Sequence, residues 1–111
     1  MIEKLFSYQH NDISYNYFRD CRTTLLYGKL MTEPHTIMFG TAFCTKEDTY
    51  NIAIGCKLAL HRFCKNLKLS REARTELQCV LEDHLYHYEK KMIQEYITSY
   101  IEEHEKKNKK R

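Results

Sequence analysis

The sequence of 111 residues lacks the features that mark disordered, membrane-spanning and disulfide-rich proteins. Three Gly and one Pro, without a low-complexity tract, exclude a linker or a disordered chain. No run approaches the ~20 apolar residues that span a bilayer, and residues 1–4 do not open a secretory signal. Five Cys without a C-x-x-C pair argue against a disulfide framework. We therefore expect one soluble intracellular domain with reduced thiols.

Charge is distributed unevenly along the chain. The formal net charge is +3, and residues 106–111 hold five of the 18 basic side chains. Residues 57–74 carry six basic side chains and one acidic one, whereas residues 75–105 carry eight acidic and two basic ones. We predict a basic disordered tail at 106–111, and a basic surface followed by an acidic one in the rest of the chain. The positive net charge of the protein then comes from the tail and not from the folded body. The simplest alternative is that both surfaces are only solvated helix faces.

The first half of the chain predicts an antiparallel β-sheet. Alternating and β-branched apolar residues place strands at 13–19, 22–27 and 36–44, all within residues 13–44. No element is predicted before residue 13, because Asn11-Asp12 interrupts the apolar pattern. In the last strand the small residues Gly40 and Ala42 share a face, which indicates that another element packs closely there.

Two helices follow, so the fold class is α+β in a single domain over residues 1–105. A capping box at 45–48, with Asp48 as the rival N-cap, predicts a first helix at about 48–66. Gly55 and Ala59 lie one turn apart and would let this helix approach the sheet closely. Ser70 is predicted to cap a second helix at about 70–103.

The second helix is long for a chain of this size. At 1.5 Å per residue it would measure ~50 Å, against a domain diameter nearer ~30 Å. Its apolar seam continues to its end, so we expect a second copy of the chain to cover it, in a short antiparallel pairing. The alternative is a kink near residue 90 that folds the end back. The predicted interface residues of this helix are Leu85, Tyr88, Met92, Tyr96 and Tyr100.

No catalytic or metal-binding pattern is present, so we expect a protein that is not an enzyme and has no cofactor. Cys56, His61 and Cys64 on the first helix, like His84 and His87 on the second, do not have the spacing of zinc ligands. No nucleophile motif and no glycine-rich phosphate loop occurs.

The basic surface is the stronger candidate for a binding site. Arg62, Lys65, Arg71 and Arg74 surround the junction of the two helices, where Ser70 opens a helix N-terminus. We predict that they bind the phosphate of a small anion, with two such surfaces meeting in a dimer. The alternative is that Arg62 pairs with Asp48 or a strand carboxylate and the others aid solubility. A long nucleic acid is disfavoured, because the acidic helix would repel it.

Residues 40–62 carry a pattern that resembles one in small bacteriophage proteins. The pattern is G-x-A-x-C-x3-D-x-[FY]-N-x3-G-x3-A-x2-R, here from Gly40 to Arg62. With a sheet followed by two helices, the chain resembles the phage Thoeris anti-defence proteins, which sequester cyclic nucleotide signals of bacterial immunity as dimers or larger sponges. The same strand-to-helix unit is also similar to double-stranded-RNA-binding-like domains. The resemblance implies that Arg62 binds the ligand.

The main hypothesis is therefore a phage-encoded inhibitor in the cytoplasm of the infected bacterium. It would bind a nucleotide second messenger through the basic residues, with an aromatic side chain such as Phe43 or Tyr50 against the base. Asn51 is also predicted to bind the ligand. A second hypothesis is an anti-CRISPR-type inhibitor that docks the acidic side chains Glu82, Asp83 and Glu89 on a host defence protein. A third is a nucleic-acid-binding regulator. No membrane partner is expected.

Overall fold

The computed structural model describes residues 2–33, 35–45 and 49–109, with side chains as far as residue 105. Two compact units make up the chain, residues 1–81 and residues 82–111. The predicted α+β class is confirmed, with an antiparallel sheet followed by two helices of which the second is long. The elements in chain order are β1 (Ile2–His10), β2 (Ile13–Asp20), β3 (Thr23–Leu30), β4 (Ile37–Phe43), α1 (Ile52–Asn66) and α2 (Arg71–Lys109).

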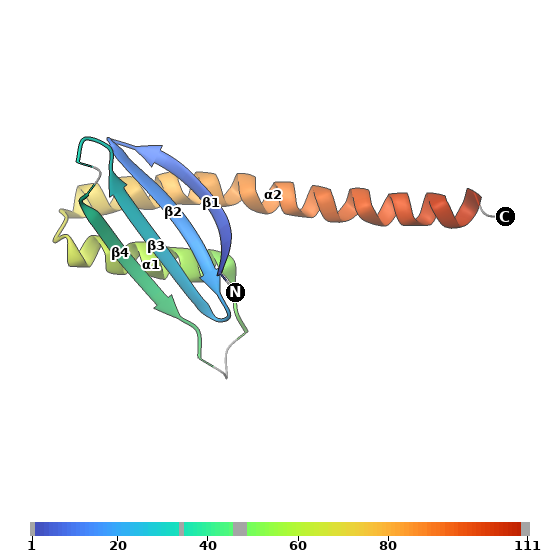
Figure 1. The fold of residues 1–111 in the computed structure, drawn as a ribbon, viewed down its shortest axis with the longest axis horizontal. Helices are drawn as coiled ribbons and strands as arrows, with labels where there is room; N and C mark the ends of the chain where they lie inside the picture. Colours follow the sequence, from blue (N-terminus) through green and yellow to red (C-terminus); the bar gives the residue numbers. More distant parts are fainter. Residues whose placement is uncertain (1, 34, 46–48, 110–111) are drawn as a thin grey trace. The chain divides into compact units, whose positions relative to one another are not determined.

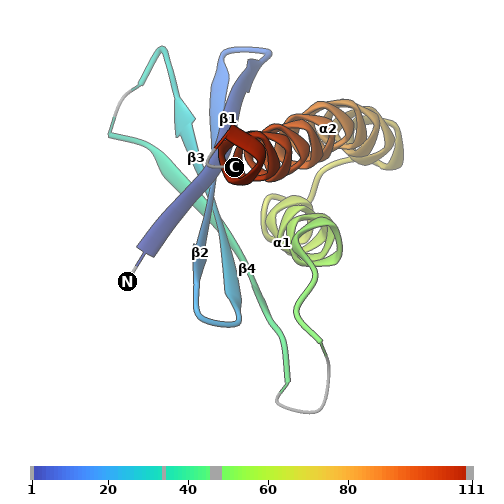
Figure 2. The ribbon, with the colours of Figure 1, turned by 90° about the vertical axis from the view of Figure 1, so that its right-hand side faces the viewer.

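The four strands form one sheet in the order β1-β2-β3-β4, with every neighbouring pair antiparallel. Helix α1 lies across one face of this sheet, over β3 and β4 (Figures 1 and 2). The first turns of α2 belong to the same unit and bury Leu77 and Leu81. The His10 side chain of β1 contacts Glu76 of α2 at 3.1 Å. One face of the sheet is thus covered by helices.

Strand β1 was not predicted, and two local features explain why. Its register against β2 shifts between Lys4 and Phe6, which breaks the two-residue alternation that identifies a strand. Asn11 and Asp12 both have positive φ, at 48° and 64°, and connect His10 directly to its partner Ile13. This is the backbone of a tight two-residue hairpin, for which Asn and Asp are favoured residues. What reads as an interruption in the sequence is the turn that creates the strand pair.

The helix boundaries differ from the predicted ones by a few residues. Helix α1 begins at Ile52 instead of residue 48, because Asn51 is its N-cap and accepts a hydrogen bond from the Ile54 N–H. The predicted cap Asp48 and most of the predicted capping box lie outside the described residues. Ser70 caps α2 as predicted, accepting from the Ala73 N–H at 3.2 Å. Helix α2 continues to Lys109, past the predicted end at 103 and without the alternative break near residue 90.

Glycine permits the contact between α1 and the sheet. A Cβ atom at Gly40 would overlap the Ala59 carbonyl oxygen, and one at Gly55 would overlap the Thr24 hydroxyl. Both glycines are buried, so helix and strand approach at backbone distance. The close packing predicted from the small residues on β4 and from Gly55 is confirmed.

Tyrosines form much of the core between β1, β2 and α1. The hydroxyl groups of Tyr8 and Tyr17 lie 2.9 Å apart and hydrogen-bond to each other inside the fold. The ring of Tyr15 packs against that of Phe63 with centroids 5.6 Å apart. Burial raises the pKa of Tyr15 to about 12 and raises the pKa of Tyr8 and Tyr17 further. The core therefore requires these phenols in their protonated form.

The second unit is the later part of α2. Leu85 is buried and Tyr88 is half-buried, whereas every residue from 89 to 105 is exposed. Neither of the two described helices contains an apolar stretch of the length that a bilayer requires.

The Gly40→Ala variant should lose stability, because the added methyl group would overlap the backbone of α1, which cannot rotate away as a flexible side chain could. We expect the free energy of unfolding in urea to fall by about 1–3 kcal/mol. The control is Thr41→Ala on the exposed side of the same strand, which should change it by less than about 0.5 kcal/mol. Equal effects of the two variants would contradict the close approach.

Alkaline pH should unfold the protein through the buried tyrosines. Their folded pKa lies above the unfolded value of about 10, so the stabilisation is complete below about pH 10 and is lost as pH rises toward about 12. Urea denaturation across this range should show a falling free energy of unfolding. Tyr15→Phe should flatten the fall, and the exposed Tyr96→Phe should not; identical slopes for both would refute this account.

Candidate functional site

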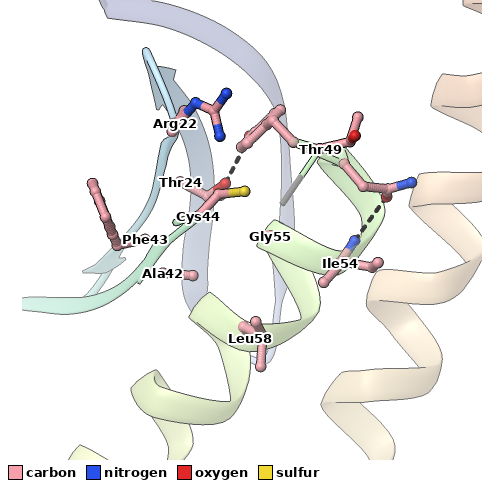
Figure 3. A pocket seen from close by; sticks show the side chains of 11 residues that line it. Arg22, Thr24, Ala42, Phe43, Cys44, Thr49, Ile54, Gly55 and Leu58 are labelled. Carbon is pink, nitrogen blue, oxygen red and sulfur yellow. Dashed lines mark hydrogen bonds between the residues drawn. The ribbon is translucent and has the colours of Figure 1, made fainter. Parts of the chain in front are cut away.

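A cavity of about 310 Å³ opens where the N-terminal turn of α1 lies over the ends of β3 and β4 (Figure 3). Small residues form its inner wall: Ala42 on β4, and Gly55 on α1. Its volume lies at the lower end of the range of small-molecule pockets, about 300–1,000 Å³. Its lining residues are Arg22, Thr24, Ala42, Phe43, Cys44, Thr49, Tyr50, Asn51, Ile54, Gly55 and Leu58.

Tyr50 is anchored in this cavity from the loop before α1. Its hydroxyl group lies 2.7 Å from the Thr24 hydroxyl, which is fully buried, and one of the two dashed lines of Figure 3 marks this bond. Gly55 leaves the space that the Thr24 hydroxyl occupies. The bond joins the loop to the sheet and fixes the ring position.

Two arginines from β2 and the β2–β3 turn bring positive charge to the Tyr50 side of the cavity. The Arg19 guanidinium lies over the Tyr50 ring, 4.3 Å from the centroid, and Arg19 Nε donates to the Cys21 carbonyl oxygen at 3.1 Å. Arg22 lines the cavity and donates from Nη1 to the Thr45 carbonyl oxygen at 2.6 Å. Among the described residues that line the cavity, Arg22 is the one that carries a charge.

The start of α1 adds a polar group to the same cavity. The Asn51 Oδ1 atom accepts from the Ile54 N–H at 3.0 Å, in the N-cap geometry of an extended residue. No acidic residue occupies the first turn of α1. The helix dipole therefore reinforces the positive character of the two arginines.

The predicted ligand-binding residues do not share one surface. Phe43, Tyr50 and Asn51 line the cavity, although Phe43 lies on the strand face opposite Ala42 and its ring points away from Thr24 in Figure 3. Tyr50 is thus the lining aromatic side chain that a hydrogen bond to Thr24 holds in place.

The predicted basic residues lie elsewhere. Arg62 and Lys65 line a depression beside Gly40, where Arg62 Nη1 donates to the Thr41 carbonyl oxygen at 2.8 Å. Arg74 lines a groove between α1 and α2 with Lys57 and His61. Arg71 is exposed at the first residue of α2. The four residues therefore do not converge on one pocket in a single chain.

Sequence reasoning missed Arg19, Arg22 and Thr24. No pattern marks them, because the hairpin that joins β2 to β3 brings them to Tyr50 from at least 26 positions away in the chain.

Within the part of the chain that the structure describes, no group of three His, Cys, Asp or Glu side chains could hold a metal ion.

The predicted interface residues of α2 also differ in accessibility. Leu85 is 3% exposed within the single chain, so it is already buried without a partner. Met92, Tyr96 and Tyr100 are exposed. Glu82, Asp83 and Glu89 are likewise exposed.

Comparison of the chain with protein-family models, with curated proteins and with solved structures finds no match.

The Tyr50–Thr24 bond should be measurable as a coupling energy. Tyr50→Phe and Thr24→Val should each lower the free energy of unfolding by about 1 kcal/mol, because each removes one partner of a partly buried hydrogen bond. The double variant should lose less than the sum of the two. Strict additivity in urea denaturation would show that the two hydroxyl groups do not interact.

Proposed function

We propose that the protein binds a small phosphorylated nucleotide, without turning it over, in the cavity at Tyr50. The observation that carries the proposal is the combination of an anchored aromatic ring, two arginines and a helix N-terminus around a cavity lined by no described carboxylate. An aromatic ring suits a nucleobase, and a guanidinium group suits a phosphate.

The ligand class follows from the chemistry of the cavity lining. Ala42, Ile54 and Leu58 offer apolar surface, as a planar base requires, and Arg22 offers a positive charge. A lone phosphate would leave the apolar surface uncovered, and an uncharged aromatic compound would leave the arginine unused. A nucleotide matches both kinds of lining residue.

The resemblance to phage anti-defence proteins supplies the proposed biological role. A binder that holds a cyclic nucleotide signal in the infected cell would keep the signal from its receptor and so block immunity. Capture without conversion is the activity we propose, because a binder of this kind blocks the signal by holding it intact.

The proposal is tested by isothermal titration with cyclic AMP, cyclic di-AMP, cyclic di-GMP and ADP-ribose. At least one nucleotide should bind, and Arg22→Gln and Tyr50→Ala should each weaken it at least tenfold, about 1.4 kcal/mol. Arg62→Gln is the matched control, an arginine on α1 outside the cavity, and should change affinity less than twofold. Circular dichroism melts verify that each variant folds.

Three other outcomes overturn parts of this proposal. Loss of binding in Arg62→Gln alone would move the site to the depression beside Gly40, as the sequence predicts. Release of an altered nucleotide on heating would indicate an enzyme. Binding of none of the four, with capture of a defence protein that charge reversal at Glu82, Asp83 and Glu89 abolishes, would favour the docking hypothesis.

A further inference from the structure

The later part of α2 exposes a continuous apolar surface, which we name the distal apolar face. Its side chains are between 44% and 73% exposed. Its members are Met92, Ile93, Tyr96, Ile97, Tyr100 and Ile101.

These six residues form two neighbouring rows along one side of the helix. Met92, Tyr96 and Tyr100 are spaced by four residues, and each is followed at once by an isoleucine of the second row. At about 100° per residue, the two rows cover roughly half of the helix circumference. A contiguous apolar surface of this kind marks an interaction site.

The distal apolar face is arranged symmetrically about the point between Tyr96 and Ile97. Met92 and Ile101 are equidistant from this point, as are Ile93 and Tyr100. A twofold interface requires that if one residue contacts a second, the second contacts the first in the other copy. Antiparallel pairing of two copies, centred on this midpoint, satisfies the twofold requirement, because each apolar residue then lies level with an apolar residue of the partner.

The charges on either side of the face distinguish antiparallel from parallel pairing. At about 100° per residue, Glu89, Lys90 and Glu103 lie on the same side of the helix as the face, whereas Lys91 and Glu102 lie on the opposite side. Antiparallel pairing about the midpoint brings Lys90 of one copy level with Glu103 of the other. Parallel pairing would set Glu89 beside Glu89 and Glu103 beside Glu103, which is repulsive.

We propose that the distal apolar face binds a second copy of the chain in an antiparallel, twofold-symmetric contact centred between Tyr96 and Ile97. Rows of residues spaced by four pack as ridges into the grooves of a like helix at a crossing angle of about −50°. The contact is therefore short and crossed, and it is not an extended zipper with a seven-residue repeat. This inference is independent of the nucleotide site, which uses no residue of α2.

The first experiment measures mass by analytical ultracentrifugation as a function of protein concentration. The wild type should dimerise, and Ile97→Asp should raise the dissociation constant at least tenfold. The matched control is Thr98→Asp, which adds the same charge one residue away, outside the face. Circular dichroism at 222 nm should show equal helix content in both variants. A monomeric wild type at the highest concentration, or equal effects of the two variants, overturns the proposal.

The second experiment tests the direction of pairing. Lys90→Glu should weaken the dimer, as should Glu103→Lys, and the double exchange should restore it to within about threefold of the wild type. In a parallel dimer the lysine exchange would replace one like-charged pair by another and change little, so an unchanged dissociation constant overturns the antiparallel arrangement. A wild type that stays monomeric but binds phosphatidylglycerol vesicles through Ile97 would assign the face to a membrane surface and refute the proposal.

Discussion

The backbone contact between α1 and the sheet is the constraint on which the rest of the first unit depends. Gly40 and Gly55 are buried where any side chain would overlap Ala59 or Thr24. Because the helix lies this close, the Phe63 ring reaches the sheet face beneath it and packs on Tyr15. A larger residue at either glycine would lift the helix and separate these rings, so two residues without side chains set the depth of the core.

The candidate site follows from the same constraint. Where α1 begins, its close approach leaves the Thr24 hydroxyl buried below Gly55, and a buried hydroxyl needs a hydrogen-bond partner. Tyr50 provides it, and the Arg19 guanidinium lies over the Tyr50 ring. The cavity is thus a consequence of how the helix starts: the helix is in contact with β4 at Gly40 and leaves room at its first turn, where Asn51 caps it.

Sequence reasoning identified what depends on local pattern and missed what depends on pairing. Some features depend only on residues that are near one another in the sequence, and these were predicted: the α+β class, the cap at Ser70 and the close-packed glycines. Strand β1 was missed because a bulge removes its alternation, and the Asn11-Asp12 turn looks like a break until its partners are known. Tyr50 could be named from a pattern beside α1, whereas Arg19 and Arg22 reach it only through the register of β2 and β3.

The later part of α2 obeys a different rule from the rest of the chain. Helices in proteins owe most of their stability to packing of one face, since propensity alone holds a helix only marginally. From residue 89 to 105 no side chain is buried, so no packing within the single chain stabilises an apolar helix face there. A segment that served only as a solvated helix would carry polar residues all round, as the opposite side of this one does at Gln94, Glu95 and Thr98. Six apolar side chains confined to one side, between Lys90 and Glu103, instead have the pattern of a surface that is buried in an assembly.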